Sequence, residues 1–134
     1  MGYTNYWYQH EDFTEDEWMK IKIFYHGLNT VHGGGFLQGA DHIMQDETTG
    51  GDHIAFNGRK GQDYETFVLS KNVNIKADYE GANPAFNFCK TARNPYDAMV
   101  WSLLCYARYV KGDRSKFVVR NDDGEHYGIE HNVE

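Results

Sequence analysis

Two cations and a hydroxyl stand directly before the start of the most apolar predicted helix, as Lys90, Thr91 and Arg93. Asn94 is a favoured N-cap residue, and Pro95 fits the first helical position because the missing N–H of proline would be unpaired there in any case. A helix N-terminus offers free N–H groups and partial positive charge, and it therefore favours anions. The cluster predicts a phosphate-binding site.

Two side chains just after this cluster leave alternatives open. Tyr96 can stack on a nucleobase, or it can belong to the core. Asp97 can accept a hydrogen bond from a ribose hydroxyl or an exocyclic amine, or it can simply cap the helix. The cluster itself also has a plain structural interpretation, in which Lys90 and Arg93 pair with nearby acids. We favour ligand binding because cations, hydroxyl and helix start coincide.

A glycine-flanked turn, Asn57-Gly58-Arg59-Lys60-Gly61, carries two more cations. As a hairpin turn it needs no function. If the sheet brings the turn close to the cluster, it adds donors for a phosphate. The predicted ligand-binding residues are therefore Lys90, Thr91, Arg93, Tyr96, Asp97, Asn57 and Arg59.

Catalytic and metal motifs do not reach the spacing that their chemistry needs. His32-Gly33-Gly34-Gly35 is similar to the oxyanion-hole segment of lipases, but the chain has no Gly-x-Ser-x-Gly nucleophile elbow. Cys89 needs a nearby histidine to act as a nucleophile. No histidine pair has His-Glu-x-x-His spacing. We expect no catalytic residue, no metal and no cofactor. The metal candidates weighed are His42 with Asp41, His53 with Asp52, and His126 with His131 and Glu130.

Composition narrows the class of protein. The 134 residues fit one domain spanning 1–134, with 40% hydrophobic and 25% charged residues. The formal charge of −7 argues against bulk nucleic-acid binding, which needs a basic footprint, but allows a small phosphorylated ligand in one basic pocket. Aromatic residues reach 16% and can line a core or a stacking surface. The sequence predicts no membrane span and no disulfide framework, which is typical of a cytosolic protein.

The elements that must position the cluster follow from apolar periodicity and turn residues. Thr14 and Glu17 form a capping-box pattern, which predicts a helix ending near Gly27. The apolar run 95–111 predicts a second, largely buried helix that Gly112 terminates. The predicted strands are 3–10, 39–44, 52–58, 64–70, 86–89 and 116–121.

This order of elements predicts an α+β, single two-layer domain. An antiparallel or mixed sheet carries the two main helices on one face. The nearest named arrangement is the ferredoxin-like β-α-β-β-α-β order, with an extra strand or hairpin.

The connection before the second helix reads Phe88-Cys89-Lys90-Thr91-Ala92-Arg93-Asn94-Pro95-Tyr96-Asp97 and is followed by Val100. This block resembles a family of small proteins of tailed phages and prophages. The chain has Asn94 where that family often has a basic residue. The resemblance implies viral origin and action in the cytoplasm of the infected bacterial host, and it supplies no reaction. Shorter matching blocks are Asn5-Tyr6-Trp7, 14–18, Phe56-Asn57-Gly58, Glu65-Thr66-Phe67 and Asp123-Gly124.

Three functions fit these observations. The favoured one is a phage accessory, anti-defence protein that binds and sequesters a small phosphorylated ligand, a nucleotide immune signal, as a homodimer or larger assembly. The second is an acidic inhibitor that docks on a host defence protein. The third is a small hydrolase of a nucleotide signal that uses Cys89 or a histidine. The acids of the second hypothesis are Glu11, Asp12, Glu15 and Asp16.

Overall fold

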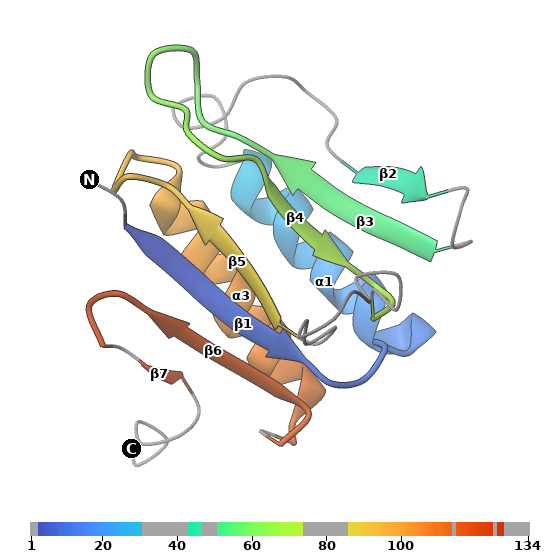
Figure 1. Cartoon of the computed structure of the whole chain (residues 1–134). Helices are drawn as coiled ribbons and strands as arrows, with labels where there is room; N and C mark the ends of the chain where they lie inside the picture. Colours follow the sequence, from blue (N-terminus) through green and yellow to red (C-terminus); the bar gives the residue numbers. More distant parts are fainter. Residues whose placement is uncertain are drawn as a thin grey trace.

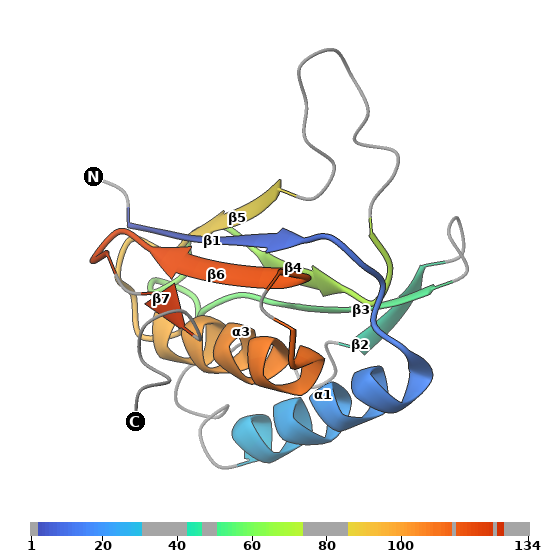
Figure 2. The same cartoon turned by 90° about the horizontal axis from the view of Figure 1, so that it is seen from below.

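The computed structural model describes residues 3–30, 43–46, 51–73, 86–113, 115–124 and 126–127. Two antiparallel sheets lie side by side there, and α1 (Glu15–Leu28) and α3 (Asp97–Lys111) cover one face of them (Figures 1 and 2). The predicted α+β layering, with two helices on one face, is confirmed. Neither described helix has the length and apolar character needed to cross a membrane.

The first sheet has the order β5-β1-β6-β7 and is built around its central strand, β1 (Thr4–Gln9). This strand pairs antiparallel with β5 (Phe86–Lys90) and with β6 (Phe117–Asn121). Successive side chains of a strand point to opposite faces. Trp7 is accordingly buried toward the helices, while Tyr6 and Tyr8 lie on the opposite, outer face and are less buried. The sequence did not predict the short β7 (His126–Tyr127).

The second sheet has the order β2-β3-β4. The predicted hairpin is confirmed as β3 (Gly51–Phe56) paired with β4 (Phe67–Ser70), with Phe56 opposite Phe67. The strand β2 (Ile43–Asp46) overlaps the predicted segment 39–44, of which residues 39–42 lie outside the described part.

The ladder of hydrogen bonds stops between β4 and β5, although these strands are neighbours in Figure 1. At one end the strands still meet, because the Glu65 N–H donates to the Lys90 carbonyl at 3.1 Å. Near the other end, the Gln9 side chain reaches from β1 to the Ser70 carbonyl. A ferredoxin-like order requires one continuous sheet and is therefore not confirmed.

Helix α1 begins as its sequence predicts. The Thr14 side chain accepts from the Glu17 N–H at 3.1 Å, and the Glu17 carboxylate accepts from the Thr14 N–H at 2.8 Å. The ring of Phe13 packs on that of Trp18, with centroids 5.9 Å apart. The helix buries Trp18, Ile21 and Tyr25, whose spacing places them on one face.

Helix α3 begins two residues later than its sequence predicts. Its N-cap is Tyr96, without a side-chain cap bond, so Asn94 as the N-cap is wrong. The reason is that the Asn94 side chain donates instead to the Asp63 carbonyl at 3.1 Å. The helix ends where predicted, at Gly112, whose φ of 79° is a left-handed conformation that glycine adopts without strain.

Lys111 ties the end of α3 to the start of α1. Its side chain is 3% exposed and pairs with Glu11 and Glu17 at 2.9 Å each. Its ammonium also donates to the Asp12 carbonyl. Burial alone would lower the pKa of Lys111, but the hydrogen bonds from its two glutamate partners outweigh burial and raise it.

Candidate ligand-binding face

The predicted cluster lies in the connection from β5 to α3, and Thr91 anchors that connection. Thr91 is fully buried. Its hydroxyl donates to Asp97 Oδ1 at 2.6 Å, and its N–H donates to the Tyr3 carbonyl at 2.9 Å. The Thr91 hydroxyl thus donates to a residue of the protein itself, whereas the sequence analysis predicted that it would bind a phosphate.

Arg93 already has two partners in the folded protein. Its guanidinium donates to Asp123 Oδ1 at 2.9 Å and stands 4.1 Å from the centroid of the Tyr3 ring. The hydrogen bond from Arg93 lowers the pKa of Asp123. Burial, followed by the hydrogen bond to Asp123, raises the pKa of Tyr3 to about 12. The pairing of Arg93 with an acid is therefore real, and the acid is Asp123 rather than the neighbouring Asp97.

Tyr96 and Asp97 both support the fold at this connection. Of the two alternatives for Tyr96, the structure shows the core: its side chain is buried, and its hydroxyl donates to the Glu65 carbonyl at 2.6 Å. Asp97 Oδ1 accepts from Asn5 Nδ2 at 2.7 Å as well as from Thr91. In this arrangement the ring of Tyr96 is not accessible for stacking.

The N–H groups at the start of α3 already have acceptors. Asp97 donates to the Asn94 carbonyl at 2.8 Å, Ala98 to Pro95 at 3.3 Å, and Met99 to Tyr96 at 3.0 Å. These tight turns occupy the donors that an anion would otherwise meet at a helix N-terminus. The helix start is thus a weaker anion site than its sequence suggests.

The turn that carries Arg59 lies beside this connection. Asn57 closes the turn, because its amide bonds the backbone of Tyr64 and the hydroxyl of Thr66. Gly58 packs so tightly on Tyr96 that an added Cβ would come within 2.7 Å of the ring. Arg59 is exposed on the same turn. The structure therefore brings the turn next to the connection, as the phosphate hypothesis requires.

Lys90 differs from the other residues of the cluster because its charge is uncommitted. Its backbone bonds Glu65, but its side chain is exposed at the end of β5. Within the described part of the chain, the ammonium groups of Lys60 and Lys90 have no hydrogen-bond or ion-pair partner, whereas those of Lys20, Lys71, Lys111 and Lys116 do.

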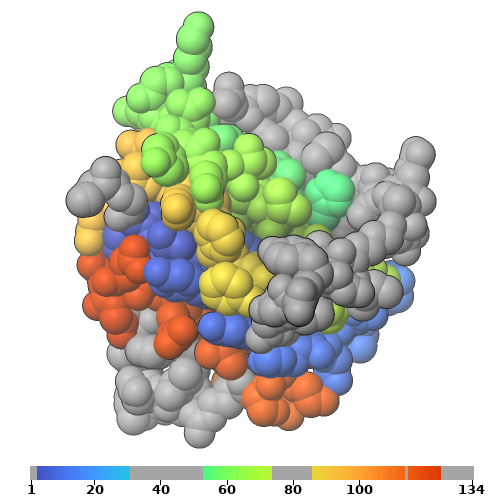
Figure 3. All heavy atoms as spheres, viewed as in Figure 1, coloured from blue at the N-terminus to red at the C-terminus, as the bar shows by residue number. Residues whose placement is uncertain are grey.

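Four aromatic rings share the outer face of the first sheet, the face opposite the helices. We call Tyr6, Tyr8, Phe86 and Phe88 the aromatic face; Figure 3 looks onto this side of β1 and β5. Phe86 lies 5.2 Å from Tyr8 and 5.9 Å from Phe88 between ring centroids. Phe86 is 37% exposed and Phe88 49%. Lys90 follows Phe88 by two residues and so projects from the same face.

Sequence reasoning missed the aromatic face, although it left a signal. Aromatic residues alternate with other residues at Tyr6 and Tyr8, and again at Phe86 and Phe88. Such alternation marks one face of a strand. It does not say whether the helices cover that face, and only the structure shows that they cover the other one.

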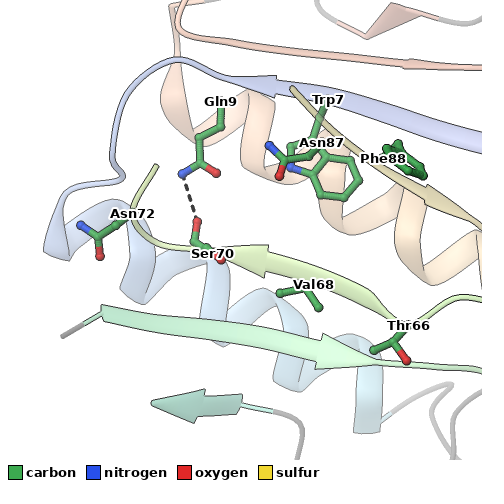
Figure 4. Close-up of a pocket in the computed structure, with 8 residues that line it drawn as sticks. All are labelled: Trp7, Gln9, Thr66, Val68, Ser70, Asn72, Asn87 and Phe88. Carbon is green, nitrogen blue, oxygen red and sulfur yellow. Dashed lines mark hydrogen bonds between the residues drawn. The ribbon is translucent and has the colours of Figure 1, made fainter. Parts of the chain in front are cut away.

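A groove of about 270 Å³ opens where the ladder stops between β4 and β5 (Figure 4). Exposed Val68 and Phe88 line it from the two strands, and buried Trp7 and Gln9 line it from β1. Asn87 lies in the same groove. The groove therefore joins the aromatic face to polar amide groups.

The structure also bears on the catalytic and metal candidates. Burial raises the pKa of the Cys89 thiol to about 12, with the charges of Glu65 and Asp97 adding to the effect, so this thiol is protonated at neutral pH. Of the metal candidates, His42, Asp41, His131 and Glu130 fall outside the described residues. Inside the described part, no three metal-binding side chains come together.

Comparisons of the chain with protein-family models, with curated proteins and with solved structures find no match. Function is therefore argued from the geometry of the aromatic face, the groove and Lys90.

Proposed function

We propose that the protein binds a small phosphorylated ligand of the nucleotide class on the aromatic face. The observation that carries this proposal is an accessible aromatic platform with an uncommitted lysine on the same strand and the same side. Aromatic rings stack on any nucleobase, and such stacking contributes about 1–3 kcal/mol per base. Lys90 lies about 7 Å along the strand from Phe88 and supplies the charge for a phosphate.

The other predicted residues differ in how directly they can contact the ligand in this proposal. Arg93 is a second cation, but an anion must compete with Asp123 for it. Arg59 lies exposed on the adjoining turn that Asn57 closes, and it is the next cation to test. The buried residues Thr91 and Tyr96 and the half-buried Asp97 hold the connection in place, and they affect the ligand only through the shape of that connection.

In our proposal the biological role is sequestration inside an infected bacterial cell. The resemblance of residues 88–97 to small proteins of tailed phages supports a ligand that serves as a nucleotide immune signal. The protonated state of Cys89 supports binding rather than hydrolysis. Tight enclosure of a ligand on an open sheet face requires a second surface, so we propose a homodimer or larger assembly.

Direct binding measurements test the proposal. Purified protein is titrated with mononucleotides, cyclic dinucleotides and ADP-ribose derivatives, and bound ligand is recovered intact after denaturation. We expect Lys90→Ala and Phe88→Ala each to weaken binding about tenfold, which corresponds to about 1.4 kcal/mol.

Two substitutions on the helices serve as matched controls. Lys20→Ala removes an exposed lysine, and Tyr109→Ala removes an exposed aromatic ring, both on the layer opposite the aromatic face. These variants should bind as the unmodified protein does. Absence of binding across the panel refutes the proposal, as does equal weakening by the controls.

The docking of an acidic surface on a host protein is the second candidate. Its four acids are exposed, but each already has a partner: Glu11 pairs with Lys116, Glu15 with Lys71, Asp16 with Lys20, and Asp12 accepts from the Val73 N–H. A basic partner must compete with these bonds. Salt-sensitive capture of one host protein, unchanged in Lys90→Ala, would favour this candidate.

A further inference from the structure

The side-chain amide of Gln9 is held in one orientation at the edge of the groove. Its side chain is 3% exposed. Nε2 donates to the Ser70 carbonyl at 3.0 Å and to the Lys71 carbonyl at 3.3 Å. An amide nitrogen has two hydrogens, and both acceptors are carbonyl oxygens, so nitrogen and oxygen cannot exchange places.

The oxygen of the same amide is left without a partner. Figure 4 shows it beside the nitrogen, on the side of the amide that is nearer to Asn87. Among the described residues, no donor to Gln9 Oε1 is found. In the described part of the chain, Gln9 Oε1 does not belong to the fully buried unpaired side-chain atoms, so this oxygen keeps some exposure although the residue as a whole is buried. The groove therefore presents one oriented acceptor that a ligand can satisfy.

The rest of the groove suits a flat ring. Its flanks are the exposed side chains of Val68 and Phe88, and Trp7 contributes an apolar surface from β1. The volume of about 270 Å³ is far above the roughly 10–15 Å³ that one water molecule needs on the same measure. That is sufficient for a bicyclic base placed edge-first between the two strands.

We infer that the groove holds an adenine base, with its exocyclic amine donating to Gln9 Oε1. This inference rests on the proposed function. Adenine offers one donor group on its hydrogen-bonding edge, which matches a single acceptor, whereas guanine offers two adjacent donor groups and leaves one unmatched. Phe88 stacks on the base, and Lys90 at the end of the same strand receives the phosphate.

The test compares ligands that differ only in the amine. Adenosine 5′-monophosphate is titrated against purine riboside 5′-monophosphate, in which hydrogen replaces the amine, and against guanosine 5′-monophosphate. We expect the adenine nucleotide to bind about three- to tenfold more tightly than the purine nucleotide, which is the range for one hydrogen bond.

Two variants separate recognition from general damage to the site. In Gln9→Met the preference for the adenine nucleotide should disappear. In Phe88→Leu both affinities should fall while their ratio stays, because stacking does not read the amine. Thermal unfolding shows whether Gln9→Met is folded; if it is not, the ligand comparison on the unmodified protein decides alone.

The outcomes separate the two claims. Equal binding of adenine and purine nucleotides overturns the adenine inference and leaves the proposed function standing. Tighter binding of the guanine nucleotide overturns it as well. If no nucleotide binds, the proposed function fails and the inference fails with it.

Discussion

Lys90 and Arg93 are three residues apart, and they differ in what they already bind. Arg93 is paired with Asp123 and stacked on Tyr3. An incoming anion must replace Asp123, so it gains only the difference between its own interaction energy with Arg93 and that of Asp123. The ammonium of Lys90 meets water, and an anion there displaces only solvent. A basic cluster in a sequence is therefore not a sum of charges, because its effective charge depends on the acids that the fold brings beside it.

At the residue scale, we predict that Cys89 does not react with alkylating reagents in the native protein. The side chain is buried, and burial raises its pKa to about 12, so the reactive thiolate is rare at pH 8. In the variant Cys105→Ser, Cys89 is the remaining thiol. Labelling of this variant, followed by mass spectrometry, should appear only after denaturant is added. Rapid labelling under native conditions would contradict the buried thiol.

At the scale of elements, the ends of α1 and α3 are joined by a single lysine. Lys111 is the last residue of α3; its partner Glu17 lies in the first turn of α1, and its partner Glu11 precedes that helix. Packing on the sheets determines which face of each helix is buried. The two ion pairs of Lys111 then hold the end of α3 beside the start of α1. Loss of the cation leaves two carboxylates close together with one fewer partner.

We predict that Lys111→Met lowers the free energy of unfolding by about 2 kcal/mol, below the range for fully buried pairs because the glutamates are partly exposed. Urea unfolding followed by circular dichroism measures it. The matched control is Lys116→Met, which removes a more exposed pair with Glu11 and should lower the free energy of unfolding by clearly less than Lys111→Met does. Equal effects of the two variants would show that Lys111 is not the tie between the helices.

An element could be predicted from the sequence when the residues that fix its ends are close together in the chain. The start of α1 was predictable because Thr14 and Glu17 satisfy each other within four residues. The start of α3 was not, because the side chain of Asn94 bonds Asp63, 31 residues away in the chain. The break between β4 and β5 was equally hidden, since no local pattern records which strands fail to pair. Lys90 was a candidate from the sequence alone, whereas the aromatic face beside it needed knowledge of which sheet face the helices cover.

At the scale of the whole molecule, the net charge of −7 coexists with carboxylates that are held in their ionised form. Hydrogen bonds from Arg93, Lys116 and Ser115 lower the pKa of Asp123, Glu11 and Asp113, respectively. These carboxylates bind protons less readily in the folded than in the unfolded chain. Their stabilisation is therefore complete at neutral pH and is lost as the pH falls through their lowered pKa values.

We predict that the melting temperature falls as the pH drops below about 5, where carboxylates of the unfolded chain begin to bind protons. Differential scanning calorimetry between pH 7 and pH 3 measures the decrease. Asp123→Asn should be less stable than the unmodified protein at pH 7, and the difference should shrink toward pH 3. A melting temperature that stays constant down to pH 3 would be inconsistent with these carboxylate contacts.

The break between β4 and β5 also bears on self-association. An unpaired strand edge at the rim of a sheet is a template on which other chains add, and it promotes aggregation. Here the two unpaired edges face each other inside the molecule. The bond from Glu65 to Lys90 at one end and the Gln9 bridge near the other leave no space for a further strand, which needs about 4.8 Å on each side. The contacts at both ends therefore protect these two strand edges from pairing with another polypeptide.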